Sequence, residues 1–95
     1  MPRIVWTRRA LAQVVEARES LLLYDAETAE HAYSLIIESP DILERFPDSG
    51  RPVPGTDNYR ELLIPYGSSG YVALYKVSGN DVFILAVRHQ RQAGY

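Results

Sequence analysis

The chain has 95 residues and no cysteine, and 46% of its residues are hydrophobic. This length predicts one domain, residues 1–95, with a thin core, and the lack of thiols excludes a disulfide framework and a thiolate metal site. The net charge of −2 lacks the strong basic excess that is typical of a dedicated nucleic-acid-binding protein.

The sequence shows no feature of a secreted or membrane protein. Residues 1–6 contain no apolar segment of a signal peptide, and no run of 18 apolar residues occurs. The two histidines, His31 and His89, fall in different predicted elements, which disfavours a zinc site. We therefore expect a soluble cytoplasmic protein without metal, cofactor or membrane association.

The first half of the chain predicts two helices after a short strand. Residues 2–6 alternate as a strand does, and Thr7 is a good N-cap for the helix that follows. Seven apolar residues of this helix share one stripe at helical period: Ala10, Leu11, Val14, Val15, Ala17, Leu21 and Leu22. Asp25 can cap a second helix, whose stripe consists of Ala29, Ala32, Tyr33, Ile36 and Ile37. The short connection predicts an antiparallel helical hairpin, and Pro40 starts a further short helix over residues 40–46.

The rest of the chain predicts a loop and three strands. The segment FPDSGRPVPGT, residues 46–56, contains three prolines and two glycines and is expected to be a loop. Strands follow at Tyr59–Pro65, Tyr71–Val77 and Val82–Arg88, separated by glycine-containing turns. The last strand is apolar on both faces, with Phe83, Leu85 and Val87 on one and Val82, Ile84 and Ala86 on the other, so we place it centrally.

The predicted fold class is α+β: an N-terminal strand, an antiparallel helical hairpin and a three-strand antiparallel meander, with the hairpin packed on one face of the sheet. The order of these pieces, together with RRALAQV, RFPDSGRP, YREL, YVALYKV and VFILAVRHQR, resembles the RelE/ParE superfamily of toxins from type II toxin–antitoxin systems. This resemblance covers nearly the whole chain. It implies a toxin that arrests growth, including in plasmid stabilisation systems, and that a cognate antitoxin neutralises in a hetero-oligomer.

The superfamily implies two different activities. RelE-like members are mRNA endonucleases that cut in the ribosome, and ParE-like members poison DNA gyrase. A metal-free nuclease needs a base, an acid and a cation for the phosphate. His89, Tyr95 and the arginines Arg60, Arg88 and Arg91 supply those residue types, which keeps the nuclease alternative open.

Each of these residues also has a non-catalytic interpretation. His89 can be a polar residue at a strand end, Arg60 can form a structural or antitoxin-facing ion pair, and Arg88 and Arg91 can solvate the end of the strand. Tyr95, as the last residue, is expected to be mobile. We therefore expect no catalytic residue, and assign Arg60, Arg88, His89, Arg91 and Tyr95 to antitoxin or target binding.

Two features place the chain closer to ParE. Only one lysine, Lys76, is present, whereas RelE-like nucleases are typically rich in lysine near the active site. The helical hairpin, roughly residues 7–46, is also long. We expect a gyrase poison as the first function, with the ribosome-dependent nuclease as the alternative and an inactive or purely interacting relative as a third. We expect the apolar stripes of residues 10–22 and 29–37 to receive the antitoxin.

Overall fold

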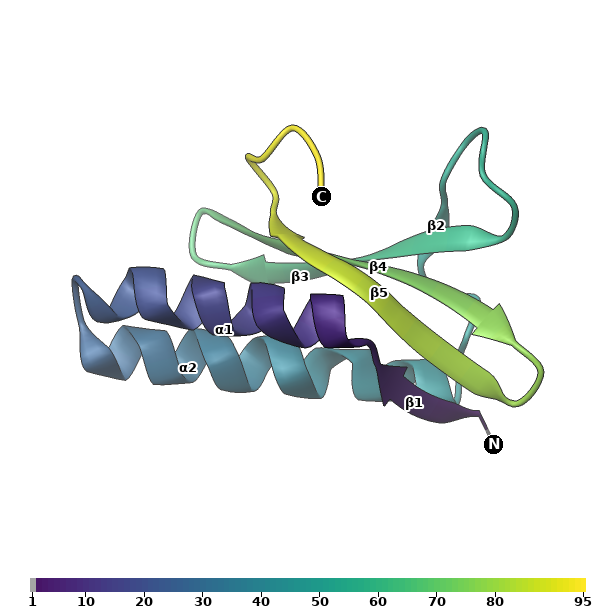
Figure 1. The fold of residues 1–95 in the computed structure, drawn as a ribbon, viewed down its shortest axis with the longest axis horizontal. Coiled ribbons are helices and arrows are strands. Elements are labelled where there is room, and N and C mark those ends of the chain that lie inside the picture. The colour runs from purple at the N-terminus through teal and green to yellow at the C-terminus, as the bar shows by residue number, and fades with distance from the viewer. Residues whose placement is uncertain (1) are drawn as a thin grey trace.

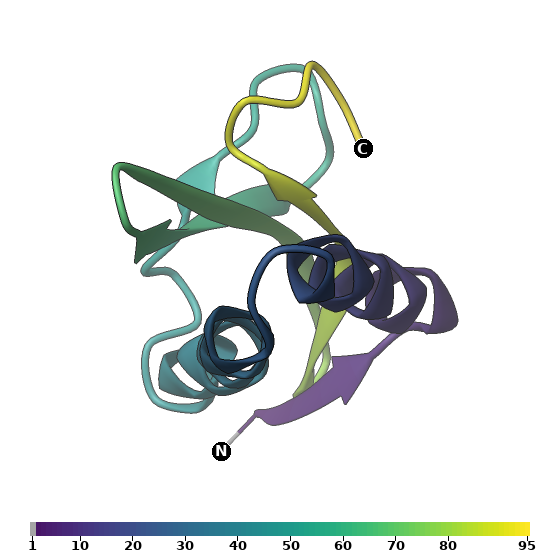
Figure 2. The ribbon, with the colours of Figure 1, turned by 90° about the vertical axis from the view of Figure 1, so that its left-hand side faces the viewer.

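The computed structural model describes residues 2–95, and its elements follow the predicted order. They are β1 (Arg3–Trp6), α1 (Arg8–Leu22), α2 (Ala26–Glu38), a 3-10 helix η1 (Ser39–Glu44), β2 (Arg51–Pro52), β3 (Tyr59–Tyr66), β4 (Ser69–Ser78) and β5 (Asp81–His89). The strands form one sheet in the order β1-β5-β4-β3-β2. The two helices pack against one side of this sheet, and the C-terminal segment lies on the side away from α2 (Figures 1 and 2).

Both helices begin where the sequence predicts. The Thr7 hydroxyl accepts the backbone N–H of Ala10 at 3.2 Å, and the Asp25 carboxylate accepts that of Thr28 at 2.9 Å. Each side chain thus satisfies an otherwise unpaired helix N–H. Thr7 also donates to the carbonyl oxygen of Ile84 at 2.7 Å, which joins the start of α1 to β5.

The sheet is mixed, because β1 runs parallel to β5 while the other neighbours are antiparallel. β1 pairs only as far as Trp6 with Ile84, and β5 continues beyond it to His89. The placement of β5 between β1 and β4 confirms that the last strand is internal to the sheet.

The predicted faces of β5 are wrong beyond Ile84. Leu74 pairs with Ala86 and Tyr75 pairs with Ile84, so Leu85 is the extra residue of a β-bulge. The bulge reverses the alternation, and Val87 joins Val82 and Ile84 in the main core, not Phe83 and Leu85.

One further expectation needs correction. The segment 46–56 is not entirely loop, because Arg51–Pro52 forms β2 and pairs with β3. The α1 stripe, in contrast, is covered only in part, as expected of a surface that could receive a partner. Ala10 and Val14 are buried, whereas Leu11 and Val15 are 42% and 43% exposed.

The loop before β2 is held against the sheet by hydrogen bonds to Tyr75 on β4. The Tyr75 hydroxyl donates to the Pro47 carbonyl at 2.7 Å and accepts the Gly50 N–H at 2.9 Å. A Cβ at Gly50 would lie 2.6 Å from the Tyr75 ring, so this position needs glycine for close approach. The motif RFPDSGRP therefore contributes a packed structural turn.

Candidate binding site at the end of β5

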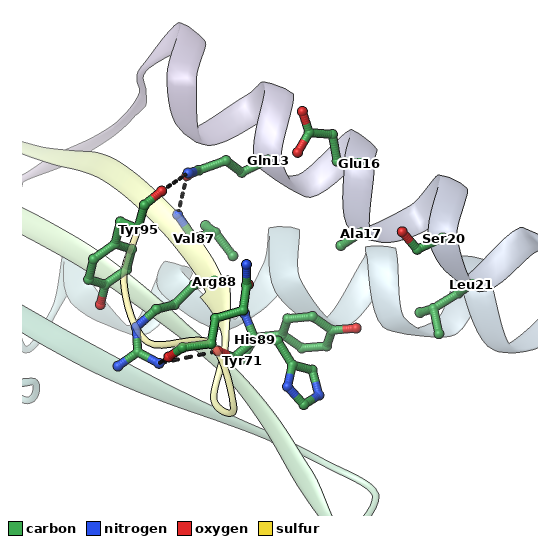
Figure 3. Close-up of a pocket in the computed structure, with 11 residues that line it drawn as sticks. Gln13, Glu16, Ala17, Ser20, Leu21, Tyr71, Val87, Arg88, His89 and Tyr95 are labelled. Atoms are coloured by element: carbon green, nitrogen blue, oxygen red, sulfur yellow. Dashed lines mark hydrogen bonds between the residues drawn. The ribbon is translucent and has the colours of Figure 1, made fainter.

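The C-terminal segment folds back over the end of β5 and is held by Arg88 (Figure 3). Arg88 Nη1 donates to the carbonyl oxygens of His89 at 3.2 Å, Gln90 at 3.2 Å and Gln92 at 3.1 Å. Its guanidinium carbon lies 5.0 Å from the centroid of the Tyr95 ring. Arg88 therefore orders the tail, where the sequence suggested a solvated strand end.

Glu61 on β3 holds the last residue in place. Its carboxylate accepts the Tyr95 hydroxyl at 2.6 Å and Arg51 Nε at 3.1 Å, and lies 3.7 Å from Arg88 Nη2. Hydrogen bonding from Tyr95 and the nearby arginines holds the pKa of Glu61 below its ordinary value, despite its partial burial. Burial and the Glu61 carboxylate raise the pKa of Tyr95. The expectation that Tyr95 is mobile is therefore wrong, since its hydroxyl proton is donated to a carboxylate.

His89 lies on the opposite face of β5 from Arg88, because successive side chains of a strand alternate. Its ring packs edge-on against Tyr71 at a centroid distance of 5.4 Å. Nδ1 accepts the backbone N–H of Arg91 at 3.1 Å, and Nε2 lies 3.2 Å from the Ser69 hydroxyl. The Nδ1 contact places the ring proton of the neutral imidazole on Nε2, so both ring nitrogens are occupied.

Arg60 does not join this group. Its Nη1 donates to the carbonyl oxygens of Asp48 at 3.1 Å and Gly50 at 2.7 Å. Arg60 on β3 pairs with Tyr75 and His89 on β5 pairs with Tyr71, so the two are about 13 Å apart in the strand direction and are separated across the sheet by β4. Arg60 thus fixes the turn before β2.

Arg91 is exposed and forms no ion pair within residues 2–95. Of the five residues assigned to binding, the structure brings together Arg88 and Tyr95, with His89 on the other side of the strand and Arg91 beyond its end. Because the Arg91 guanidinium makes no ion pair within residues 2–95, it is more available to a partner carboxylate than Arg60 or Arg88.

A pocket of about 400 Å³ opens between α1 and the C-terminal segment. Its lining combines apolar and polar side chains: Gln13, Glu16, Ala17, Ser20, Leu21, Tyr71, Val87, Arg88, His89, Gln92 and Tyr95. Gln13 points from α1 toward the end of the chain, and its amide contacts both Val87 and Tyr95 (Figure 3).

The two candidate proton-transfer groups of this pocket already have protein partners. A base needs a free lone pair and an acid needs a proton that it can release to substrate. The ring nitrogens of His89 and the hydroxyl of Tyr95 are engaged with protein groups on different sides of β5. Across residues 2–95, no three histidine, aspartate or glutamate side chains gather closely enough to hold a metal.

Sequence reasoning missed Glu61, Gln13 and Gln92. Alternation along YREL puts Glu61 on the opposite face from Arg60, and this was the available signal for Glu61. Gln13 acts through contacts that span 74 and 82 residues of sequence, which no local pattern reveals. Gln92 acts on His89, three residues away, but a glutamine in a tail carries no distinctive signal.

Comparison with known proteins agrees with this architecture. The family model described as the ParE toxin of type II toxin–antitoxin systems, parDE, matches residues 4–94. Among relatives, "Toxin RelE3" of Caulobacter vibrioides is 33% identical over 85% of this chain and 86% of its own length. "Toxin RelE2" of the same organism is 30% identical over 94% and 96%.

Further similarity extends to another genus and to a solved structure. The "Putative toxin Y4kP" of Sinorhizobium fredii is 34% identical over 95% of this chain and 90% of its own. A solved chain described as "Chromosomal ParDE TA system from P. aeruginosa" shares the fold, with a TM-score of 0.81, 24% identity, and coverage of 94% and 96%. None of the helices within residues 2–95 has the length and apolar character required to cross a bilayer. The chain belongs to the ParE toxin family, within the RelE/ParE toxins of type II toxin–antitoxin systems.

Proposed function

We propose that this toxin poisons DNA gyrase and is neutralised by a cognate antitoxin with which it forms a hetero-oligomer in the cytoplasm. The observation that carries the proposal is the engagement of His89 and Tyr95, the two candidate proton-transfer groups. Tyr95 donates its hydroxyl proton to Glu61 at 2.6 Å, and His89 has contacts at both ring nitrogens. A poison that acts by binding gyrase requires no proton transfer from either side chain.

The charge of the molecule supports the same proposal. Binding to ribosomal RNA and mRNA gains most of its affinity from lysine and arginine contacts with phosphates. This chain has a net charge of −2 and a single lysine. Arg60 and Arg88 are held by backbone carbonyl groups, which leaves them less available to a phosphate.

A ribosome-dependent mRNA endonuclease is the second candidate. Two relatives carry the name RelE, and Arg88, His89 and Tyr95 come from one short segment that lines a pocket. Catalysis would require Tyr95 to leave Glu61 and His89 to free a ring nitrogen. Substrate binding would have to drive both changes.

The test is a pair of assays on the purified toxin. With gyrase, ATP and plasmid DNA, we expect loss of supercoiling and accumulation of DNA cleaved in covalent gyrase complexes. With translating ribosomes, primer extension should show no new mRNA ends. Cleaved mRNA together with unaffected gyrase would establish the nuclease and reject the gyrase proposal.

For the antitoxin, we propose contacts on two surfaces. The exposed face of α1, carrying Leu11, Val15 and Leu22 at helical spacing, offers an apolar stripe. In the C-terminal segment, Arg91 is the first cation for acidic antitoxin residues, because its guanidinium makes no ion pair within residues 2–95. Arg88, His89 and Tyr95 in the same segment, and Arg60 at the turn before β2, would contribute only where the antitoxin replaces their present partners. Charge reversal at Arg91 and Arg88 that leaves antitoxin affinity unchanged would reject the electrostatic part.

A further inference from the structure

The last residues of β5 extend past the end of β1 and lack a neighbouring strand on that side. β1 has four residues and its pairing ends at Ile84, whereas β5 runs to His89. On this side, Val87 and His89 have no neighbouring strand. Gln90 N–H, by contrast, bonds the Gly70 carbonyl at the β4 side, as alternation requires.

The N–H groups at this edge are capped by side chains instead of by a strand. Val87 N–H donates to Gln13 Oε1 at 2.7 Å, and His89 N–H donates to Gln92 Oε1 at 2.7 Å. Each glutamine thereby occupies a position that a neighbouring backbone carbonyl takes in a sheet. A side-chain cap of this kind can rotate away without breaking any strand pairing.

Space for an added segment lies beside the same edge. The pocket of about 400 Å³ is lined by Val87, His89 and both glutamines, and its apolar lining includes Leu21 and Tyr71. Gln13 Nε2 also donates to the Tyr95 carbonyl at 3.0 Å, so the α1 side of the groove is tied to the tail. The pocket therefore offers two backbone N–H donors and an apolar lining, and only the hydrogen bonds of Gln13 and Gln92 cover the donors.

We propose that the antitoxin inserts an extended segment here as a short additional strand, which pairs with Val87 and His89 in line with β1. Strand addition takes its affinity from main-chain hydrogen bonds and its specificity from alternate side chains. The inference rests on the antitoxin partnership in the proposed function and is independent of gyrase.

Charge defines the chemistry of the inserted segment. Residues 82–95 contain two arginines and no acidic residue, and Arg88 lines the pocket. The partner segment therefore carries an apolar residue toward Leu21 and Tyr71 and acidic residues toward the tail. Glu16 on the α1 side confines those acidic residues to the β5 side.

The first test uses Gln13→Ala, with Gln90→Ala as a matched control. The side chain of Gln90 makes no hydrogen bond within residues 2–95, so its removal should change nothing. Gln13→Ala leaves the Val87 N–H without its protein partner in the free toxin, whereas the inserted strand restores one in the complex. We expect the free variant to unfold at lower urea and its antitoxin Kd to fall by about two- to tenfold, the worth of one hydrogen bond. A weakened or unchanged Kd would overturn the inference.

The second measurement needs no variant. Amide hydrogen exchange of the parent toxin should slow at Val87 and His89 by at least about tenfold when the antitoxin binds, because a main-chain bond opens less often than a side-chain cap. Unchanged exchange at these two amides in a complex that does form would reject the strand while leaving the partnership intact. A negative gyrase assay would have no bearing on either result.

Discussion

At the scale of single residues, the arginines of this chain have different roles, and their neighbours determine which. Arg88 holds three backbone carbonyl groups of the tail and has only 16% of its side chain exposed. Arg91 lies three residues later and makes no ion pair within residues 2–95. The sequence shows both arginines and not their acceptors, because backbone carbonyl groups carry no signature in a residue pattern.

We therefore predict different costs for the two arginine substitutions. Arg88→Ala should lower the free energy of unfolding by about 1–2 kcal/mol, since several charge-assisted bonds to the tail are lost. Arg91→Ala should change it by less than about 0.5 kcal/mol, as is usual for an exposed residue. Urea denaturation of both variants measures this difference. Equal effects would mean that Arg88 does not order the tail.

The Glu61–Tyr95 hydrogen bond predicts a pH dependence at both extremes. The pKa of Glu61 is lowered from 4.5 in the folded state, so its contribution to stability is present above that value and lost as the pH falls through the lowered pKa. The pKa of Tyr95 is raised from 10.0, so its contribution is present below pH 10 and lost as the pH rises above it.

Tyr95→Phe removes this hydrogen bond alone, so the variant shows how much of the pH dependence of stability comes from the Glu61–Tyr95 pair. The variant should lose part of the acid dependence and one tyrosine's share of the alkaline dependence, at most about 1.4 kcal/mol per pH unit. Tyr71 and Tyr75, whose pKa values are also raised, keep the remaining alkaline slope, and Asp25 keeps part of the acid slope. Unfolding curves recorded from pH 3 to 11 that coincide for the variant and the parent would disprove the contact.

At the scale of elements, the sequence predicts features that depend on residues a few positions apart, and it does not predict features that depend on distant strands. Thr7 and Asp25 are visible as caps because each acts on a residue three positions away. The two-residue β2 contains a proline and is recognisable only beside β3, and the Leu85 bulge only beside β4. The tail contact between Tyr95 and Glu61 crosses 34 residues, so no periodicity predicts it.

The outward face of α1 gives a prediction for the antitoxin. Leu11→Ser with Val15→Ser should leave the unfolding free energy within about 1 kcal/mol, because both side chains are more than 40% exposed. The same double variant should weaken antitoxin binding, since it removes apolar area from the docking stripe. Isothermal titration with the purified antitoxin measures this loss. As the matched control, Val14→Ser on the buried face should destabilise the fold. Unchanged antitoxin affinity in the double variant would exclude α1 as a docking element.

The turn before β2 is a second element with a specific requirement. Gly50→Ala places a Cβ 2.6 Å from the Tyr75 ring and 2.8 Å from the Glu61 carbonyl oxygen. We expect a loss of about 1–3 kcal/mol in unfolding free energy, as overpacking usually costs. Gly55→Ala is the comparison, because nothing lies within 4 Å of its added Cβ, although its φ of +77° adds backbone strain. A neutral Gly50→Ala would mean that the turn is free to move away from Tyr75.

At the scale of the whole molecule, the distribution of charge and of engaged groups supports the proposal of a toxin that acts by binding. The middle of the chain, residues 11–50, has two arginines and nine acidic residues, so the segment that contains the helical hairpin has an acidic excess, which disfavours contact with phosphates. The two ends of the chain carry the basic excess. Fold and family could be predicted from sequence because the order of elements is encoded locally. The site could be predicted only as a set of residue types, because the partners of its side chains come from other elements.

The measurement that tests the central claim most directly is the growth of a bacterial host that produces His89→Gln without antitoxin. Glutamine keeps a hydrogen-bonding side chain and cannot act as a general base near neutral pH. Because gyrase poisoning needs no proton transfer, we expect growth arrest close to that of the parent, with cleaved gyrase–DNA complexes in the arrested cells. General acid–base groups contribute about 10²–10⁴-fold in rate. A folded variant that still binds antitoxin but no longer arrests growth, together with gyrase that the parent toxin leaves unaffected, would contradict the account in favour of the nuclease.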